Sequence, residues 1–141
     1  MLMGLDPLLS GELLAALDAM GHSDAVVLAD AHFPAARLAE RLIVLPGCTT
    51  PELLRAVCSV VPLDEAPAVD LMTSADGKVL PVQEELLSSA GIALDQAGFL
   101  DRQAFYDAAA SAYVVVRTGE TRPYGNALLR KGVVTAQDGQ A

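Results

Sequence analysis

The chain has 141 residues, of which 52% are hydrophobic and 19% charged, and its 18 acidic residues against 9 Lys and Arg give a net charge of −9. This length and apolar content predict a single folded domain over residues 1–141 and exclude a disordered chain. The negative charge argues against nucleic acid as a partner, and no apolar run approaches the roughly 18 residues needed to cross a membrane.

Short apolar runs and helix-capping residues alternate along the chain, which predicts alternating strands and helices. In chain order we expect a helix from Ser10 to Met20, strands at Ala25–Ala29 and Leu42–Leu45, a helix opened by Thr49–Glu52, a strand at Val69–Thr73, a helix at Pro81–Ala90, a helix beginning at Asp101, and strands at Ala112–Arg117 and Ala127–Val134. Gly21 and Gly91 are expected to end their helices in the left-handed conformation. The continuous apolar runs at 25–29 and 42–45 are typical of strands covered on both faces.

This alternation predicts an α/β fold, a single three-layer α/β/α domain with a mostly parallel central sheet. Sites in such sheets form at the loops that follow strands. We expect a homo-oligomer, because the apolar content is high for so small a chain. The N-terminus shows no secretory signal pattern, and the two cysteines, Cys48 and Cys58, fit reduced thiols, so we expect a cytoplasmic protein.

His22 is the first candidate for chemistry, and it lies between the first expected helix and the first expected strand. A histidine titrates near neutral pH and both donates and accepts protons, so His22 is a candidate catalytic acid/base. The alternative is a loop histidine that only hydrogen-bonds the backbone.

Asp30 directly follows an apolar strand, where a carboxylate is costly unless it is paired or binds a ligand. The alternative is a cap or turn residue. His32 is two residues further along, so an Asp-x-His metal site with His22 or Asp24 is a possible second interpretation. The scarcity of histidines argues against it, and we expect no metal.

Two further segments carry polar groups suited to a hydroxyl-rich ligand. Arg102 opens a helix with Phe105 and Tyr106 on neighbouring faces, and it is either a ligand clamp or a solvated first-turn residue. Phe105 is favoured as a core residue over a ligand contact. The segment Tyr124–Asn126 offers hydroxyl and amide groups around Gly125, which permits close backbone approach, or is an ordinary turn.

Several kinds of site are missing from the sequence. It contains no glycine-rich phosphate loop, no dinucleotide fingerprint, no G-x-S-x-G elbow and no Cys–His nucleophile pattern. We therefore expect no cofactor, and the available chemistry is proton transfer and hydrogen bonding.

Taken together, these motifs resemble the L-fucose mutarotase and D-ribose pyranase family. The resemblance extends from about Leu5 to Val134 and rests on motifs in the family's order at Met20–Pro34, Phe105–Tyr106, Arg117–Glu120, Tyr124–Asn126 and Leu128–Val133. It implies an enzyme that interconverts sugar anomers, and the Asp-Ala-His-Phe-Pro run with Arg102 and Tyr106 resembles the fucose branch. The segment from Asp64 to Leu100 matches less well.

The resemblance also implies roles for individual residues. His22 and Tyr124 correspond to the catalytic positions, and the substrate-binding positions fall on Asp30, Arg102, Tyr124, Gly125 and Asn126. Family members form rings, often decamers, with the sugar site between subunits, so a monosaccharide and further copies of the chain are the implied partners. Three alternatives stay open, namely a ribose pyranase, a non-catalytic sugar-binding ring, and a metal-dependent hydrolase using Asp30 and His32.

Overall fold

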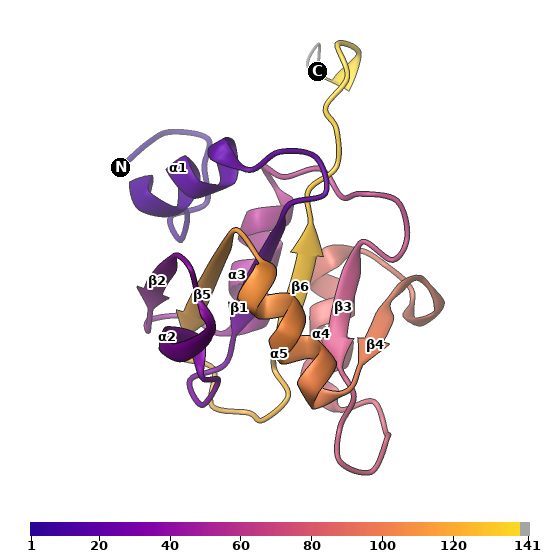
Figure 1. The fold of residues 1–141 in the computed structure, drawn as a ribbon. Helices are drawn as coiled ribbons and strands as arrows, with labels where there is room; N and C mark the ends of the chain where they lie inside the picture. Colours follow the sequence, from indigo (N-terminus) through magenta and orange to yellow (C-terminus); the bar gives the residue numbers. More distant parts are fainter. Residues whose placement is uncertain (139–141) are drawn as a thin grey trace.

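The computed structural model describes residues 1–138, which form a sheet with helices on both faces (Figure 1). The helices are α1 (Gly11–Ala19), α2 (Ala35–Leu38), α3 (Thr50–Cys58), α4 (Pro81–Ala90), the short 3-10 helix η1 (Leu94–Gln96) and α5 (Arg102–Ser111). The strands are β1 (Ala25–Ala29), β2 (Leu42–Leu45), β3 (Val69–Met72), β4 (Gly98–Leu100), β5 (Val114–Thr118) and β6 (Ala127–Arg130). No helix within these residues is both long and apolar enough to span a bilayer.

The six-stranded sheet has the order β2-β5-β1-β6-β3-β4. The pairs β2–β5, β5–β1 and β3–β4 are parallel, whereas β6 runs antiparallel to both of its neighbours, β1 and β3. The expected α/β fold with a mostly parallel sheet is therefore confirmed. The antiparallel β6 brings its amino end to the edge of the sheet at which the parallel strands end.

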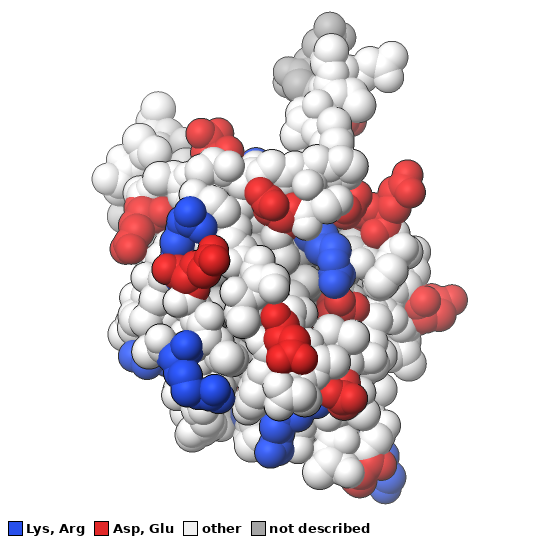
Figure 2. All heavy atoms as spheres, viewed as in Figure 1, with Lys and Arg blue, Asp and Glu red and all other residues white. Residues whose placement is uncertain are grey.

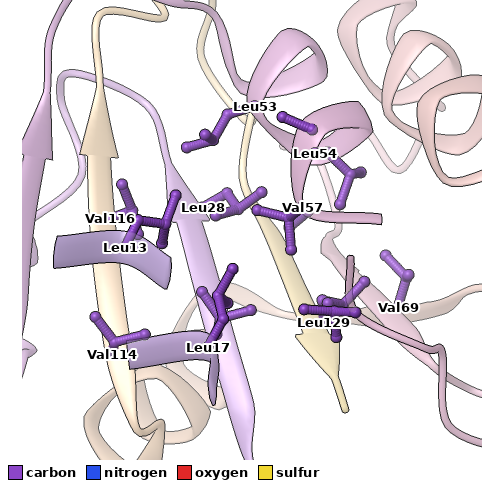
Figure 3. Packing of buried hydrophobic residues seen from close by; sticks show 14 of the residues in the cluster. Leu13, Leu17, Leu28, Leu53, Leu54, Val57, Val69, Val114, Val116 and Leu129 are labelled. Atoms are coloured by element: carbon purple, nitrogen blue, oxygen red, sulfur yellow. The ribbon is translucent and has the colours of Figure 1, made fainter. Parts of the chain in front are cut away.

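The two faces of the sheet bury separate apolar clusters, because successive strand residues point to opposite faces. Val26 and Leu28 of β1 pack with α1, α3 and α4 on one face. Figure 3 shows Leu28 in this cluster with labelled leucines of α1 and α3. Val27 and Ala29 pack with α5 and α2 on the other face, around the fully buried Phe105. This is the three-layer arrangement that the alternation of elements predicted.

Local signals placed most of the elements correctly. Ser10, Thr49 and Asp101 each accept a hydrogen bond from the first turn of their helix, and Thr49 forms a full capping box with Glu52. Gly91 ends α4 with a φ of 68°, as expected. α2, η1 and β4 were not predicted.

Several of the expectations were wrong in detail, among them the strand expected at Ala112–Arg117, which is Val114–Thr118, and the strand expected at Val69–Thr73, which ends at Met72. Gly21 does not end α1 in the left-handed conformation, because the Lys131 ammonium donates to the carbonyls of Leu17 and Met20 at 2.7 Å and satisfies that helix end. The edge strand β2 is not covered on both faces, because Leu42 and Val44, which point to the same face, are exposed. The last strand ends at Arg130 rather than Val134.

The surface is acidic without a basic region on the face seen in Figure 2. Lys and Arg side chains of the described residues lie apart from one another there, among acidic and uncharged side chains. This distribution agrees with the net charge of −9.

Candidate functional site

A cavity of about 260 Å³ lies at the carboxyl ends of the parallel strands. It is lined by Asp30, His32, Phe33, Met72, Arg102, Tyr106, Pro123, Tyr124 and Asn126. Four segments contribute: the loop after β1, the end of β3, the start of α5, and the loop between β5 and β6. In open α/β sheets this end of the strands is where ligands bind. The fold thus brings together Asp30, Arg102, Tyr124 and Asn126 from distant parts of the sequence.

Asp30 and Asn126 form a reciprocal pair at the floor of this pocket, and both are nearly fully buried. The Asn126 amide nitrogen donates to Asp30 Oδ2 at 3.0 Å, and the Asp30 backbone N–H donates to Asn126 Oδ1 at 2.8 Å. Asp30 Oδ1 accepts from the backbone N–H of His32 at 2.9 Å. Asp30 therefore also stabilises a turn, which was the alternative to a ligand-binding role. Both carboxylate oxygens are held in place, and each keeps acceptor capacity for a ligand hydroxyl.

Burial raises the pKa of Asp30 above its ordinary value, and the hydrogen bonds from His32 and Asn126 only partly offset this. Because the folded-state pKa is raised, the cost of burying the charge is present at neutral pH and is relieved as the pH falls. Asp30 therefore gains a proton at a higher pH than a free Asp side chain does.

We expect a carboxyl NMR titration of Asp30 to show a midpoint above that of aspartate in a short unstructured peptide. Asn126→Ala removes a donor that stabilises the carboxylate, and it should move the midpoint of Asp30 to still higher pH. A midpoint for Asp30 at or below that of the peptide would contradict this account of the pocket.

The loop between β5 and β6 holds Tyr124 in an unusual backbone conformation, with a φ of 63°. Such left-handed conformations are strained for residues other than glycine and occur preferentially at functional sites. Gly125 follows, and a Cβ there would lie 2.9 Å from Glu120 Cγ and 3.1 Å from the Arg122 carbonyl oxygen. Gly125 is thus needed because the loop is folded tightly on itself.

An ion pair between a buried carboxylate and a partly exposed guanidinium supports this loop, and no motif in the sequence marked it. Glu120 is 2% exposed and accepts from the Arg122 guanidinium at 3.0 and 3.1 Å, and Arg122 also bonds Glu85 of α4. Burial opposes ionisation of Glu120, but the hydrogen bonds and the charge of Arg122 outweigh it and lower the pKa of Glu120. The pair holds the turn that presents Tyr124.

Aromatic side chains form one wall of the pocket. Tyr106 packs edge-on against Phe33, with ring centroids 5.4 Å apart. Phe105 has no exposed surface and packs edge-on against Phe33 from below, at 5.8 Å, so it is a core residue, as favoured. Arg102, at the first position of α5, lies at the mouth. An apolar wall with polar groups at the floor and mouth suits a small polyhydroxylated ligand.

His32 also lines the pocket, and its Nε2 lies 3.1 Å from the Thr121 carbonyl oxygen. A carbonyl only accepts, so this nitrogen is the donor. Within residues 1–138, no group of three or more His, Cys, Asp or Glu side chains is placed to hold a metal ion. The pair of Asp30 and His32 therefore has no third protein ligand in the described part of one chain.

His22 does not lie in this pocket. It precedes β1, whereas Asp30 follows β1, so the two are separated by at least the length of this five-residue strand, roughly 17 Å at about 3.3 Å per residue. The His22 side chain is 61% exposed, and its Nε2 lies 3.1 Å from Asp64 Oδ1, beside a separate surface hollow at the opposite edge of the sheet. Asp64 was not identified from sequence, because 42 residues separate it from His22 and no local motif marks it.

Residues 3–134 match the family model described as the RbsD / FucU transport protein family. The fucose mutarotase of Streptococcus pneumoniae, solved in complex with L-fucose, is 35% identical, with a TM-score of 0.86 over 95% of this chain and 100% of that one. FucU from Bifidobacterium longum is 33% identical, with a TM-score of 0.83 over 94% of this chain and 99% of that one. Bacillus subtilis RbsD, solved with D-ribose, has the same fold at 23% identity, with a TM-score of 0.76 over 94% of this chain and 100% of that one.

Proposed function

The chain belongs to the RbsD/FucU family, and from this membership and the pocket at the end of β1 we propose that it is a sugar mutarotase. It interconverts the α and β anomers of L-fucose, or of a related aldose, by opening and reclosing the sugar ring. The observation that carries the proposal is the buried pair of Asp30 and Asn126 at the floor of a small polar pocket. Such a pair presents fixed acceptors and a fixed amide to sugar hydroxyls.

The reaction requires only proton transfer. A base takes the proton of the anomeric hydroxyl while an acid protonates the ring oxygen, and the resulting aldehyde rotates and recloses on either face. We assign the proton exchange to His22, with Tyr124 as a second acid/base or orienting group. Asp30, Arg102 and Asn126 hold the hydroxyls. Acid/base groups of this kind contribute roughly 10²–10⁴-fold, which is a useful acceleration for a reaction that also proceeds in water.

We further propose that the chain forms a homo-oligomer and that each site contains residues of two neighbouring subunits. The family resemblance implies that this oligomer is a decamer. Because β1 separates His22 from its own pocket, His22 serves the pocket of a neighbouring copy. Exposed apolar side chains support such contacts, with Val133 and Val134 each 59% exposed on the segment that follows β6, and Leu42 and Val44 at the β2 edge. Symmetric assembly would repeat the same composite site at each interface.

The test is exchange NMR on the anomeric protons of L-fucose, with D-ribose, D-galactose and D-glucose measured in parallel. We expect the protein to accelerate α/β exchange of L-fucose by roughly 10²–10⁴-fold and His22→Ala to abolish the acceleration. Full activity of a folded His22→Ala variant would refute the role of His22. Acceleration with D-ribose alone would indicate a pyranase instead. Saturation transfer without acceleration would indicate a non-catalytic sugar-binding ring.

A further inference from the structure

Asp64 is the hydrogen-bonding centre of the surface around His22. Its carboxylate accepts from Ser23 Oγ at 2.8 Å and from the backbone N–H of Glu65 at 2.9 Å, and Oδ1 lies 3.1 Å from His22 Nε2. The Asp64 side chain is 16% exposed, far less than that of His22. The exposed imidazole is thus held by a carboxylate that is itself held by two other donors.

The segments that carry His22 and Asp64 are both tied to the end of β6. The backbone N–H of Ser23 donates to the Lys131 carbonyl at 2.8 Å, and that of Asp64 donates to the Arg130 carbonyl at 3.1 Å. Gly132 permits the close approach, because a Cβ there would lie 2.3 Å from the Leu63 carbonyl oxygen. Ser23 adopts a φ of 68°, a strained conformation that this double attachment holds. The relative position of the two side chains is therefore determined by the sheet and not by a free loop.

A carboxylate in this position controls which imidazole nitrogen carries the proton. An ionised carboxylate only accepts, so the Nε2 that faces Asp64 is the protonated nitrogen and Nδ1 keeps the lone pair. Hydrogen bonds from Ser23, from the backbone of Glu65 and from His22 hold the pKa of Asp64 below its usual value, so it is ionised at neutral pH. The same negative charge stabilises the imidazolium that forms when Nδ1 takes a proton.

We propose that Asp64 is a positioning residue for His22, which it holds as the Nε2–H tautomer with Nδ1 free to exchange a proton with the sugar. This inference rests on the proposed acid/base role of His22 and adds to it the residue that orients the imidazole and compensates its charge. Asp64 itself does not touch the substrate.

Two variants of Asp64 separate its hydrogen bond from its charge. Asp64→Asn can still accept from His22 Nε2 through its amide oxygen but carries no charge, whereas Asp64→Leu can do neither. We expect kcat for sugar exchange to be highest in the wild type, lower in Asp64→Asn and lowest in Asp64→Leu. An acid/base group contributes roughly 10²–10⁴-fold to the rate, and Asp64→Leu should lower kcat by about 10-fold or more. KM should change little, because Asp64 does not contact the sugar.

The tautomer is read independently of activity from the ¹⁵N shifts of the His22 ring. We expect the wild type and Asp64→Asn to show the Nε2–H form and Asp64→Leu to show a mixture of both tautomers. Glu65→Gln is the matched control, because it removes an adjacent exposed carboxylate, and it should leave the tautomer and kcat unchanged. Circular dichroism verifies that each variant is folded.

The outcomes distinguish this inference from the proposed function. An inactive His22→Ala together with an Asp64→Leu variant of wild-type kcat and tautomer would overturn the positioning role and leave the mutarotase proposal intact. A fully active His22→Ala would remove the acid/base role of His22, and the positioning role with it. An equal fall of kcat in Glu65→Gln would show a general effect of charge and would likewise overturn the inference.

Discussion

A mixture of His22→Ala and Asp30→Asn subunits should recover about a quarter of the wild-type activity after joint refolding, although each variant alone is inactive. In a site made by two copies, His22 comes from one subunit and Asp30 from the next. Random assembly from equal amounts gives both intact residues at about one interface in four. The measurement is anomeric exchange NMR on the mixed oligomer and on each variant separately.

Asp30→Asn is an informative partner in this mixture because both Asp30 oxygens accept from N–H groups, one on His32 and one on Asn126. An amide at this position must turn a donor toward one of them, and it leaves a buried donor without an acceptor, at a cost of about 1–3 kcal/mol. The variant should therefore remain folded while its pocket is disrupted. Circular dichroism and the size of the oligomer check this point.

The matched control places both substitutions on one chain and mixes this double variant with wild type. A composite site again predicts about a quarter of full activity, whereas a site within one chain predicts about half. If each site lies within one chain, a mixture of the two single variants gives no activity. An inactive mixture of single variants, with half activity in the control, would show that each subunit works alone and would refute the shared site.

Arg130→Met is expected to cause a large loss of stability, about 3 kcal/mol, because it leaves the buried carboxylate of Asp70 without its cation. Asp70 of β3 is 4% exposed, and the Arg130 guanidinium of β6 donates to it at 2.6 Å and to the Pro67 carbonyl at 3.1 Å. Gly98 of β4 lies opposite Asp70, and a Cβ there would lie 1.9 Å from its carboxylate. The carboxylate therefore occupies space that only a glycine at position 98 leaves free.

The measurement is urea unfolding at equal protomer concentration, because the stability of an oligomer depends on concentration. The control is the double variant Asp70→Asn/Arg130→Met, in which no buried charge remains, and it should recover much of the loss. A single Arg130→Met variant as stable as wild type would contradict the role of Arg130 as the cation that stabilises the buried Asp70 carboxylate. Equal losses in the single and double variants would attribute the effect to packing of the Arg130 side chain.

Most elements of this protein could be predicted from local signals. The apolar runs at 25–29 and 42–45 are strands with those bounds, and Thr49 and Asp101 begin helices, because side-chain caps and hydrophobic spacing act over a few residues. The elements that were missed, among them α2 and β4, are only four and three residues long. Segments this short offer too few positions for a periodic pattern to be recognised.

The sequence by itself also named most of the polar residues that line the pocket, since a carboxylate after a buried strand is costly unless it has a partner. It could not identify the partners. Asp30 and Asn126 are 96 residues apart, and they meet because β6 runs antiparallel beside β1, so that the start of one strand adjoins the end of the other. The same pairing leaves His22 at the opposite edge, beside Asp64. Strand order and direction depend on contacts between residues distant in sequence, which no local pattern encodes, so only the tertiary structure decided which of these side chains share a site.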